Sequence, residues 1–313
     1  MVATQVKPRG LTGHTVSRAP FWTIRRRDNL VGYLFVGPQL VGSALFVLLP
    51  LALVGWYSFQ EWNVLAGTFE FAGADNYAKL FADQNLRGVL AATALFSVGL
   101  VALNLALALL LAILLNQRLR GTTVFRVLFF SPVLVSLVAW TVVWQFLLQA
   151  DGGINGLLGV AGIDGPNWLR GEGTAMLSVI VVQVVKNVGL NMVLFLAALQ
   201  GVPAQLYEAA QLDGARAWTR FARITVPLIS PTILLTSIIT VVGSLQVFAQ
   251  IAVLTQGGPG TSTTVLVYYL YQQAFQFHHF GYGATLSVVL FVIVGVLTLV
   301  QWRLRRKWVF HES

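Results

Sequence analysis

The sequence lacks cysteine altogether and is poor in charge. With no Cys among its 313 residues, disulfide scaffolds, thiol catalysis and cysteine metal sites are excluded. Only 10% of the residues are charged, whereas a soluble domain carries about 25%. The chain is 57% hydrophobic with a mean hydropathy of +0.75, which also excludes intrinsic disorder. The class that remains is an all-α polytopic membrane protein.

Long apolar runs predict six transmembrane helices. A helix that crosses a ~30 Å hydrocarbon core needs about 20 residues. Three runs contain no charge and a fourth contains only Lys186, while a charge-free region after Arg223 divides into two more apolar blocks. The predicted spans are 29–60, 88–117, 127–150, 174–200, 226–254 and 283–302. Pro38 and Pro50 are expected to kink the first.

The positions of the basic residues predict the topology. Lys and Arg concentrate in cytoplasmic segments of membrane proteins. Most of the 20 basic residues lie in four alternate segments, and the other connections are mainly acidic. Both termini are therefore expected in the cytoplasm, and the net charge of +9 predicts topology rather than a nucleic-acid partner. The four basic segments contain Lys7, Arg9, Arg18 and Arg25–Arg27; Arg118, Arg120 and Arg126; Arg216, Arg220 and Arg223; and Arg303, Arg305, Arg306 and Lys307.

The same pattern predicts how the chain is organised. We expect residues 1–28 to form a basic cytoplasmic arm, since the apolar run after them is too long for the core of a cleaved signal peptide. The first transmembrane helix (29–60) and an external loop (61–87) follow. Residues 88–303 form a core of five further helices, which includes a cytoplasmic loop at 200–227. Residues 304–313 form a cytoplasmic tail.

Several catalytic and binding motifs are missing. No G-x-x-x-x-G-K-[ST] occurs, and the 257–260 glycine cluster has no Lys and is interpreted as a turn. His278 and His279 are adjacent, so their side chains point apart, and the other two histidines are distant. No metal site, bound cofactor or nucleophile–base pair is therefore predicted, which disfavours a membrane-embedded enzyme.

The spans also lack acidic residues. Proton- and sodium-coupled carriers usually place Asp or Glu inside the bundle, and here none falls in an apolar core. An autonomous secondary carrier remains the alternative interpretation. If this chain moves a solute uphill, we expect another chain to supply the energy.

The 200–227 loop carries the clearest local signals. Pro203 suits the first turn of a helix, where its missing N–H costs nothing. The residues from Ala204 to Leu212 are mostly good helix formers, and Gly214 is a natural left-handed stop. A second short helix is expected over 217–223. The prediction is a helix–turn–helix at the cytoplasmic surface, which could simply anchor two spans.

The residues of this loop resemble a known motif. Its pattern is similar to the "EAA" loop of binding-protein-dependent ABC importer permeases. The resemblance implies a type I importer permease fold, and a non-catalytic subunit whose loop is the coupling helix seated in a cleft of a cytoplasmic ATPase. The matching residues are Glu208, Ala209, Ala210, Asp213, Gly214, Ala215, Phe221, Ile224, Pro227 and Leu228.

Further residues resemble the carbohydrate branch of that family. The resemblance implies a substrate such as a disaccharide, an oligosaccharide or a glycerol phosphate. It also implies an ATPase dimer that binds ATP and Mg²⁺, a second and usually different permease, an extracytoplasmic solute-binding protein, and a bacterial or archaeal cytoplasmic membrane with its lipid. Ala249 and Ala252 depart from the pattern. The matching residues are 196–200, Pro203, Phe248, 254–255, 257–260, Thr263, Tyr271, 274–275 and 281–282.

Two polar stripes are candidates for the solute path. Polar groups that face lipid are costly, so Gln183, Asn187 and Asn191, with Lys186 beside them, are expected to face the bundle interior. They could bind solute hydroxyls or hold helices together, and Lys186 could meet water, an acid of the second permease, helix carbonyls or the solute. The second stripe consists of Ser237, Thr240 and Ser244. It could likewise bind solute or hold helices together, because small residues favour close helix contact.

Overall fold

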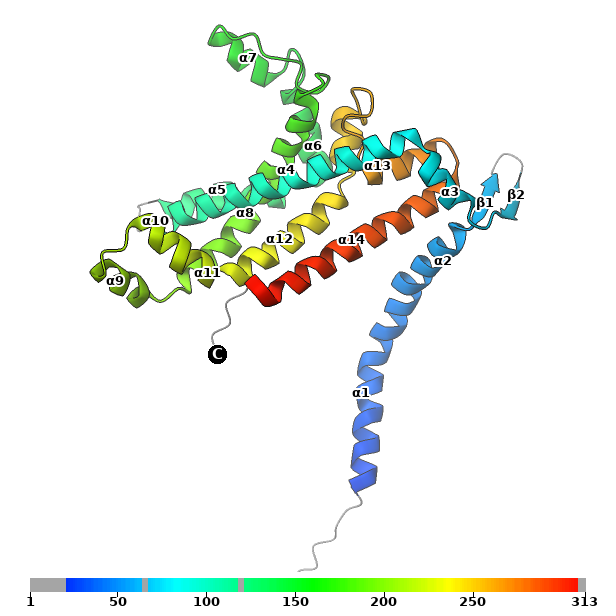
Figure 1. Cartoon of the computed structure of the whole chain (residues 1–313), viewed down its shortest axis with the longest axis horizontal. Helices are drawn as coiled ribbons and strands as arrows, with labels where there is room; N and C mark the ends of the chain where they lie inside the picture. The colour runs from blue at the N-terminus through cyan, green and yellow to red at the C-terminus, as the bar shows by residue number, and fades with distance from the viewer. Residues whose placement is uncertain (1–20, 64–66, 118–120, 309–313) are drawn as a thin grey trace, which may run out of the picture. The chain divides into compact units, whose positions relative to one another are not determined.

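The computed structural model describes residues 21–63, 67–117 and 121–308. The chain divides into two compact units, 1–53 and 54–313, and each is described here by itself (Figure 1). The elements are α-helices and short π-helical turns, with one small β-hairpin in the second unit. The predicted helical class is confirmed, and the hairpin is an addition to it.

The first unit accommodates Pro50 with a change of helix type. Helix α1 (Phe21–Ser43) continues into a π-helical turn, η1 (Ala44–Leu48), and then into α2 (Leu49–Tyr57), which runs on into the second unit. The N–H of Leu49 donates to the carbonyl of Ala44, five residues back. A proline ring clashes with the carbonyl four residues before it, so a wider turn ahead of Pro50 relieves the clash.

The second unit begins with a hairpin and leads through five helices to a long central one. Strands β1 and β2 pair antiparallel, with Gln60 opposite Phe71. The elements are β1 (Gln60–Asn63), β2 (Thr68–Phe71), α3 (Asp75–Ala82), α4 (Gln84–Leu115), α5 (Thr122–Leu134), α6 (Leu137–Leu147), α7 (Gly153–Val160) and α8 (Thr174–Gln200).

The remaining elements are shorter until the last helix. They are α9 (Ala204–Leu212), α10 (Ala217–Arg220), η2 (Phe221–Thr225), α11 (Val226–Leu228), α12 (Ser230–Leu245), η3 (Ile251–Thr255), α13 (Leu266–Tyr271), η4 (Gln272–Gln276) and α14 (Phe280–Trp308). Within this unit, α9 and α10 lie at one end of the long helices, and α3, α13 and the hairpin lie at the other (Figure 1).

Four described helices are long and apolar enough to cross a membrane, and two bent pairs raise the number to six. The four are Val31–Tyr57, Gln84–Leu115, Thr174–Gln200 and Phe280–Leu304. Helices α5 and α6 are bent by 103°, and the Ala217–Leu228 and Ser230–Leu245 segments are bent by 68°. The third and fifth predicted spans are therefore broken segments rather than continuous helices.

Prolines lie beside both breaks. Pro132 lies in the last turn of α5, and Val135 after it is extended, with ψ 139°. Pro231 occupies the first turn of α12, directly after the break at Ile229. The predicted extension of the fifth span to Leu254 is wrong, because α12 ends at Leu245. The polar side chain of Gln250 in the following segment is instead buried against α8.

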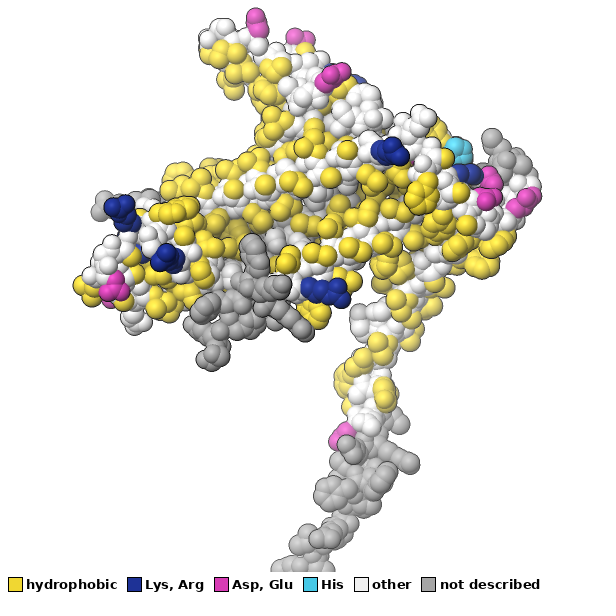
Figure 2. All heavy atoms as spheres, viewed as in Figure 1, with side chains coloured by type: hydrophobic (Ala, Val, Ile, Leu, Met, Phe, Trp, Pro, Cys, Tyr) yellow, Lys and Arg dark blue, Asp and Glu magenta, His cyan; other side chains and the backbone are white. Residues whose placement is uncertain are grey.

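Helix α8 lies at the centre of the second unit. It packs against α4, α5 and α12, and it is the most buried of the four long helices. Apolar side chains of α4 such as Phe96 and Leu100 meet Val182, Met192 and Phe195 of α8 in the main core. Apolar side chains also cover much of the visible outer surface of the second unit's helices (Figure 2). A soluble monomer rarely exposes so large an apolar area, whereas a membrane protein presents it to lipid.

Gly189 permits the close approach of α8 and α5. A Cβ atom at this position would overlap the carbonyl oxygen of Phe129 and come within 2.9 Å of the Cα of Phe130. Both obstacles are backbone atoms, so no side-chain rotation could relieve the collision. Small residues at helix contacts allow such close packing in membranes.

Replacing Gly189 with alanine should therefore separate α8 from α5. Overpacking of this kind costs about 1–3 kcal/mol, so the detergent-solubilised Gly189→Ala protein should melt at a lower temperature than the wild type. The matched control is Gly295→Ala in α14, where an added Cβ meets no atom within 4 Å. Equal melting temperatures for the two variants would contradict this account of the α5–α8 contact.

Candidate functional site

The 200–227 loop folds as a helix and a left-handed turn. Helix α9 covers the predicted residues, and Gly214 has φ +73°, so both predictions are confirmed. The N–H of Ala215 donates to the carbonyl of Ala210 at 2.9 Å, which closes the helix end in the way that a left-handed glycine allows. Pro203 lies one position earlier than expected, at the N-cap.

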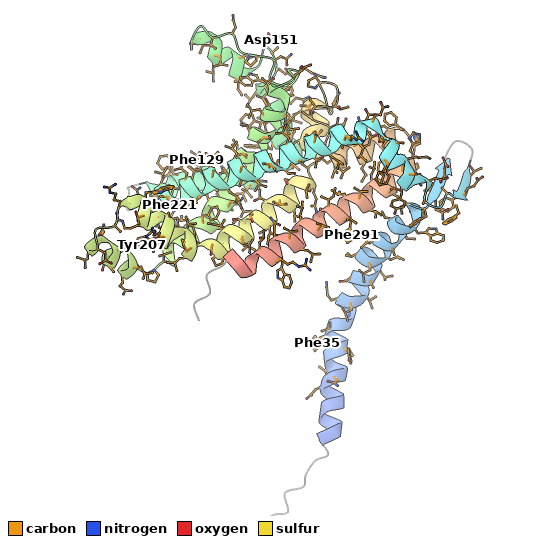
Figure 3. All side chains as sticks on the ribbon, in the orientation of Figure 1. Phe35, Phe129, Asp151, Tyr207, Phe221 and Phe291 are labelled. Carbon is orange, nitrogen blue, oxygen red and sulfur yellow. The ribbon has the colours of Figure 1, made fainter. Side chains whose placement is uncertain are left out.

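The second arm of the loop is tied back to the first. The predicted second helix begins at Ala217 but changes at Phe221 into the π-helical turn η2. The hydroxyls of Tyr207 in α9 and Thr225 in η2 are hydrogen-bonded at 2.9 Å. Tyr207 and Phe221 lie at the same end of the unit (Figure 3) and line a cavity of about 230 Å³ together with ends of α4 and α8. The arms are thus held in a fixed relation.

The outer surface of this loop is largely open. Glu208, Ala209, Asp213 and Gly214 are exposed, whereas Ala210, Ala215 and Phe221 are half-buried. Two large apolar side chains also stand out from it, Leu212 at 91% exposure and Trp218 at 74%. Sequence reasoning missed both, although apolar residues among the charges of the 200–227 loop were a signal. Together they add exposed apolar area to the surface of the loop.

Lys186 holds the broken end of α5. Its Nζ donates to the carbonyls of Pro132 at 2.7 Å and Val135 at 2.8 Å, and it lies 5.6 Å from the centre of the Trp140 ring. The last carbonyls of a helix lack intrahelical partners and carry partial negative charge, so they suit an ammonium group. Among the partners that the sequence leaves open, the structure supplies helix carbonyls, and Lys186 is only 7% exposed.

The other residues of the α8 stripe separate into two groups. The side chain of Gln250 donates to Gln183, and Asn187, one turn further, is half-buried without a hydrogen bond to any described residue. Asn191 is buried and donates to Asn104 of α4 and, at 3.0 Å, to Thr240 of α12. Asn191 therefore links α4, α8 and α12, whereas the side-chain amide of Asn187 has no hydrogen-bond partner among the described residues.

The α12 hydroxyls mostly bond within their own helix. Ser237 donates to Leu234, Thr240 to Thr236 and Ser244 to Val241, at 2.7–2.8 Å. Thr240 and Ser244 are buried, while Ser237 is half-buried. Such intrahelical bonds let polar side chains sit in a packed bundle at little cost. Thr240 alone of the three also bonds a predicted site residue, Asn191.

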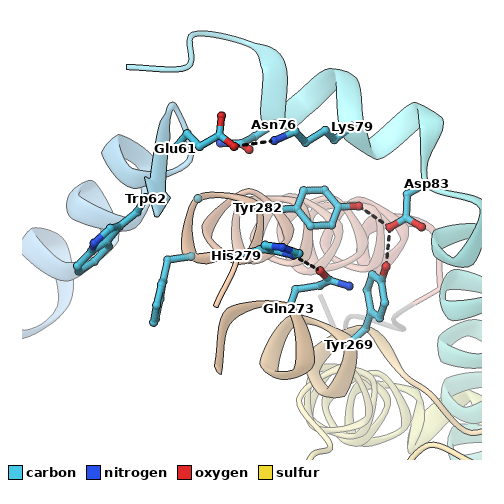
Figure 4. A pocket seen from close by; sticks show the side chains of 11 residues that line it. Glu61, Trp62, Asn76, Lys79, Asp83, Tyr269, Gln273, His279 and Tyr282 are labelled. Carbon is cyan, nitrogen blue, oxygen red and sulfur yellow. Dashed lines mark hydrogen bonds and ion pairs between the residues drawn. The ribbon is translucent and has the colours of Figure 1, made fainter. Parts of the chain in front are cut away.

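A polar cavity of about 480 Å³ lies at the opposite end of the second unit from the 200–227 loop (Figures 1 and 4). Tyr269 of α13 and Tyr282 of α14 each donate to Oδ2 of Asp83 at 2.6 Å. At the rim, Lys79 pairs with Glu61 at 3.4 Å. Sequence reasoning did not find this cavity, which is here called the outer cavity because it lies at the end of the unit opposite to the 200–227 loop. Its lining is completed by Trp62, Asn76, Gln273, His279, Phe280 and Gly281.

Asp83 is held ionised in this cavity. Burial would raise its pKa, but the hydrogen bonds from Tyr269, Tyr282 and the backbone N–H groups of Asn85 and Leu86 outweigh burial and lower it. Burial and the bond to Asp83 raise the pKa of Tyr269, so that hydroxyl stays protonated and remains a donor. The cluster is therefore a charged acceptor with fixed neutral donors at neutral pH.

Strand β1 is anchored to α3 and α14 beside this cavity. Gly281 lies so close to β1 that a Cβ atom would overlap the carbonyl oxygen of Gln60. Asn76 donates to the carbonyls of Ser58 and Gln60 at 3.1 and 2.8 Å. In the glycine cluster, Thr263 and Thr264 donate to the carbonyls of Gly258 and Gly257. As expected, the cluster is a turn, and it is braced by hydroxyls.

The sequence of this chain matches a known protein family. Residues 104–307 match the family described as "Binding-protein-dependent transport system inner membrane component". The chain belongs to this family. The predicted resemblance is confirmed, and the chain is a multi-pass inner-membrane permease subunit.

Curated relatives align over nearly the whole permease. The probable ABC transporter permease protein YesP of Bacillus subtilis is 32% identical, over 92% of this chain and 94% of its own. The lactose transport system permease protein LacF of Rhizobium radiobacter is 34% identical, over 94% and 99%. The sn-glycerol-3-phosphate transport system permease protein UgpA of Yersinia pestis is 33% identical, over 90% and 95%.

A solved structure shares the fold. One chain of a bacterial ABC transporter involved in the import of the acidic polysaccharide alginate superposes with a TM-score of 0.78. The match covers 92% of this permease and 99% of that chain, at 24% sequence identity. The predicted importer permease fold is therefore confirmed.

Removing the charge of Lys186 should weaken the permease itself. Lys186→Met would leave the Pro132 and Val135 carbonyls without their donor, and an unsatisfied buried polar group costs about 1–3 kcal/mol. We expect a lower melting temperature in detergent. Arg87→Met, which removes an exposed cation of α4, is the control and should melt like the wild type. A Lys186→Met protein of unchanged stability but altered transport would instead indicate a role in the solute path.

Proposed function

We propose that this chain is one permease subunit of an ATP-driven, binding-protein-dependent importer for a sugar or a related compound. The observation that carries the proposal is the 200–227 loop, which has the family's motif on an exposed, rigidly turned surface. The names of the relatives, which include permeases for lactose and for sn-glycerol 3-phosphate, support a disaccharide, oligosaccharide or glycerol phosphate as substrate.

The 200–227 loop is the proposed coupling element. Glu208 makes no hydrogen bond or ion pair with the described residues, so its carboxylate is open to a partner. Leu212 lies one helical turn from Glu208 on α9, and Trp218 of α10 is an exposed aromatic side chain of the kind that is enriched at interface hot spots. Seating these groups in a cleft of the ATPase would transmit the movement of that subunit to α8 and α12, which continue directly from the two arms of the loop.

The solute path is assigned to Asn187, whose amide has no partner among the described residues, and to its neighbour Gln183, whose oxygen accepts from Gln250. Gln183 and Asn187 lie one helical turn apart, and their amides match sugar hydroxyls as donors and acceptors. Asn191, Thr240 and Lys186 are assigned to the support of this path because their hydrogen bonds join helices, and Ser244 because it is buried and bonded within α12. Ser237 remains a candidate for the half of the pathway that this chain supplies.

The remaining partners follow from the same proposal. The chain itself is non-catalytic, and a cytoplasmic ATPase dimer binds ATP and Mg²⁺. A second permease, a different homologue, completes the path, and an extracytoplasmic solute-binding protein delivers the substrate. The assembly lies in the cytoplasmic membrane of a bacterium or archaeon, with both termini of this chain in the cytoplasm.

Coupling can be tested at the turn of the loop. Gly214 has no atom near its missing Cβ, so a side chain there acts through the backbone alone. Valine at φ +73° adds strain of about 1–2 kcal/mol and should displace the docking surface. We expect Gly214→Val to insert normally but to lose transport and substrate-stimulated ATP hydrolysis.

Asparagine tolerates the left-handed conformation and provides the matched control. Gly214→Asn should retain most transport in the same proteoliposomes. Full transport by Gly214→Val would count against the coupling role of the loop.

The energy source can be tested with the purified chain. Because no phosphate-binding loop is present, the isolated permease should neither bind nor hydrolyse ATP. Hydrolysis should appear when the ATPase is added and rise with loaded binding protein, and uptake should stop without ATP. Uptake by the reconstituted chain alone, driven by an ion gradient, would favour an autonomous secondary carrier instead.

A further inference from the structure

A continuous row of aromatic rings connects the outer cavity with the interior of the second unit. The row, here called the aromatic ladder, contains Trp62, Phe280, Phe275, Tyr271 and Phe248. Successive ring centres are separated by 5.0, 6.0, 5.6 and 5.0 Å. Tyr268 packs beside its inner end, 6.1 Å from Phe248. The rings come from four separate segments of the chain, so the fold rather than a local repeat builds the row.

The outer end of the ladder opens into the polar cavity. Trp62 and Phe280 both line it, beside the Asp83–Tyr269–Tyr282 cluster and the Gln273–His279 hydrogen bond (Figure 4). Aromatic walls with a few fixed polar groups are the usual composition of a small-molecule site, and about 480 Å³ lies within the usual size range. Hydroxyl, amide, imidazole and carboxylate groups in one cavity match a ligand rich in hydroxyls.

The inner end of the ladder reaches the proposed solute path. Phe248 lies two residues before Gln250, whose side chain donates to Gln183 of α8. Asn187 and its open amide follow one turn further along the same helix. A solute that moves along the rings therefore arrives at the amides assigned to the path.

The aromatic residues of the ladder are not fully buried within this chain. Phe275 is 60% exposed and Trp62 is 40% exposed, while Phe280, Tyr271 and Phe248 are half-buried. Each of these side chains therefore keeps area that is free of contacts within this chain. Flat apolar faces stack on the C–H faces of sugar rings, and they offer nothing comparable to a small phosphate ester.

The charges along the route do not favour an anion. Lys186 is occupied by two carbonyls, and Lys79 is paired with Glu61. Asp83 adds a negative charge to the cavity wall. Among the described residues that line the cavity and ladder, no cation is left without a partner.

We propose that the outer cavity and the aromatic ladder form an entry route that binds a neutral saccharide of two or more rings by stacking. The proposal rests on the proposed importer function and narrows its substrate class. It selects neutral sugars over glycerol phosphate, and it assigns positioning roles to Trp62, Phe275 and Phe280.

The test uses the complete transporter, reconstituted with its ATPase, second permease and binding protein. A panel of neutral di- and trisaccharides and sn-glycerol 3-phosphate is screened for stimulated ATP hydrolysis. Uptake is then measured with saturating loaded binding protein for Phe275→Leu, Phe280→Leu and Trp62→Leu. Leucine keeps the apolar bulk but removes the flat face. Phe81→Leu in α3, 90% exposed and outside the ladder, is the control.

We expect a neutral saccharide to stimulate ATP hydrolysis. Each leucine variant of the ladder should take up that saccharide about 3- to 10-fold more slowly than the wild type, which is the scale of one aromatic contact. The rate of ATP hydrolysis should change little. Phe275→Trp should restore uptake and Phe81→Leu should behave as wild type. Wild-type uptake in all leucine variants would overturn the ladder and indicate that these rings are only an aromatic belt at the membrane surface.

The substrate screen distinguishes a failure of the neutral-saccharide proposal from a failure of the proposed importer function. Stimulation by sn-glycerol 3-phosphate alone, or by no compound of the panel while the complex still hydrolyses ATP, would overturn the neutral-sugar assignment and leave the importer function standing. A complete complex that neither hydrolyses ATP nor transports would overturn the proposed function, and the ladder proposal with it.

Discussion

The contact between α8 and the broken end of α5 is the constraint on which the second unit depends. Lipid offers no water to satisfy freed backbone groups, so a broken span needs donors from elsewhere in the protein. Lys186 supplies them to Pro132 and Val135, and Gly189, three residues further, lets the two backbones approach closely enough. The charge and the missing side chain act together: without either one, the sharp bend between α5 and α6 would lose its support.

This contact also explains which parts of the fold the sequence predicts. Long apolar runs and the Gly214 turn are local features, fixed by hydropathy and by the left-handed conformation that glycine favours. The break after Pro132 depends on Lys186, 54 residues later, and no local pattern contains that information. For the same reason α12 was expected to continue to Leu254: the bond between Gln250 and Gln183 is a tertiary interaction.

The same distinction between local features and tertiary interactions applies to the candidate sites. The 200–227 loop is a contiguous motif, so its helix, turn and exposed face follow from its residues. The outer cavity joins Asp83 to Tyr269 and Tyr282, which are 186 and 199 residues away, and it could be found only in three dimensions. The α8 stripe lies between these cases. The spacing of its polar residues can be recognised in the sequence. Only the structure distinguishes Asn191, which is hydrogen-bonded to two other helices, from Asn187, which has no partner among the described residues.

Helix α8 connects the 200–227 loop with the α8 stripe and with the broken end of α5. It is a single unbroken helix of 27 residues that begins after the 161–173 segment, where Ser178 donates to the carbonyl of Trp168, and it ends four residues before Ala204 of the 200–227 loop. Its neighbours α5–α6 and α10–α12 are bent pairs. In the proposed coupling mechanism, displacement of the loop would be carried by this unbroken helix, while the bends lie in its neighbours. Gln183, Asn187 and Lys186 lie on that helix, so the proposed mechanism predicts that a movement of the loop shifts the amides assigned to the solute path and the support of α5 together.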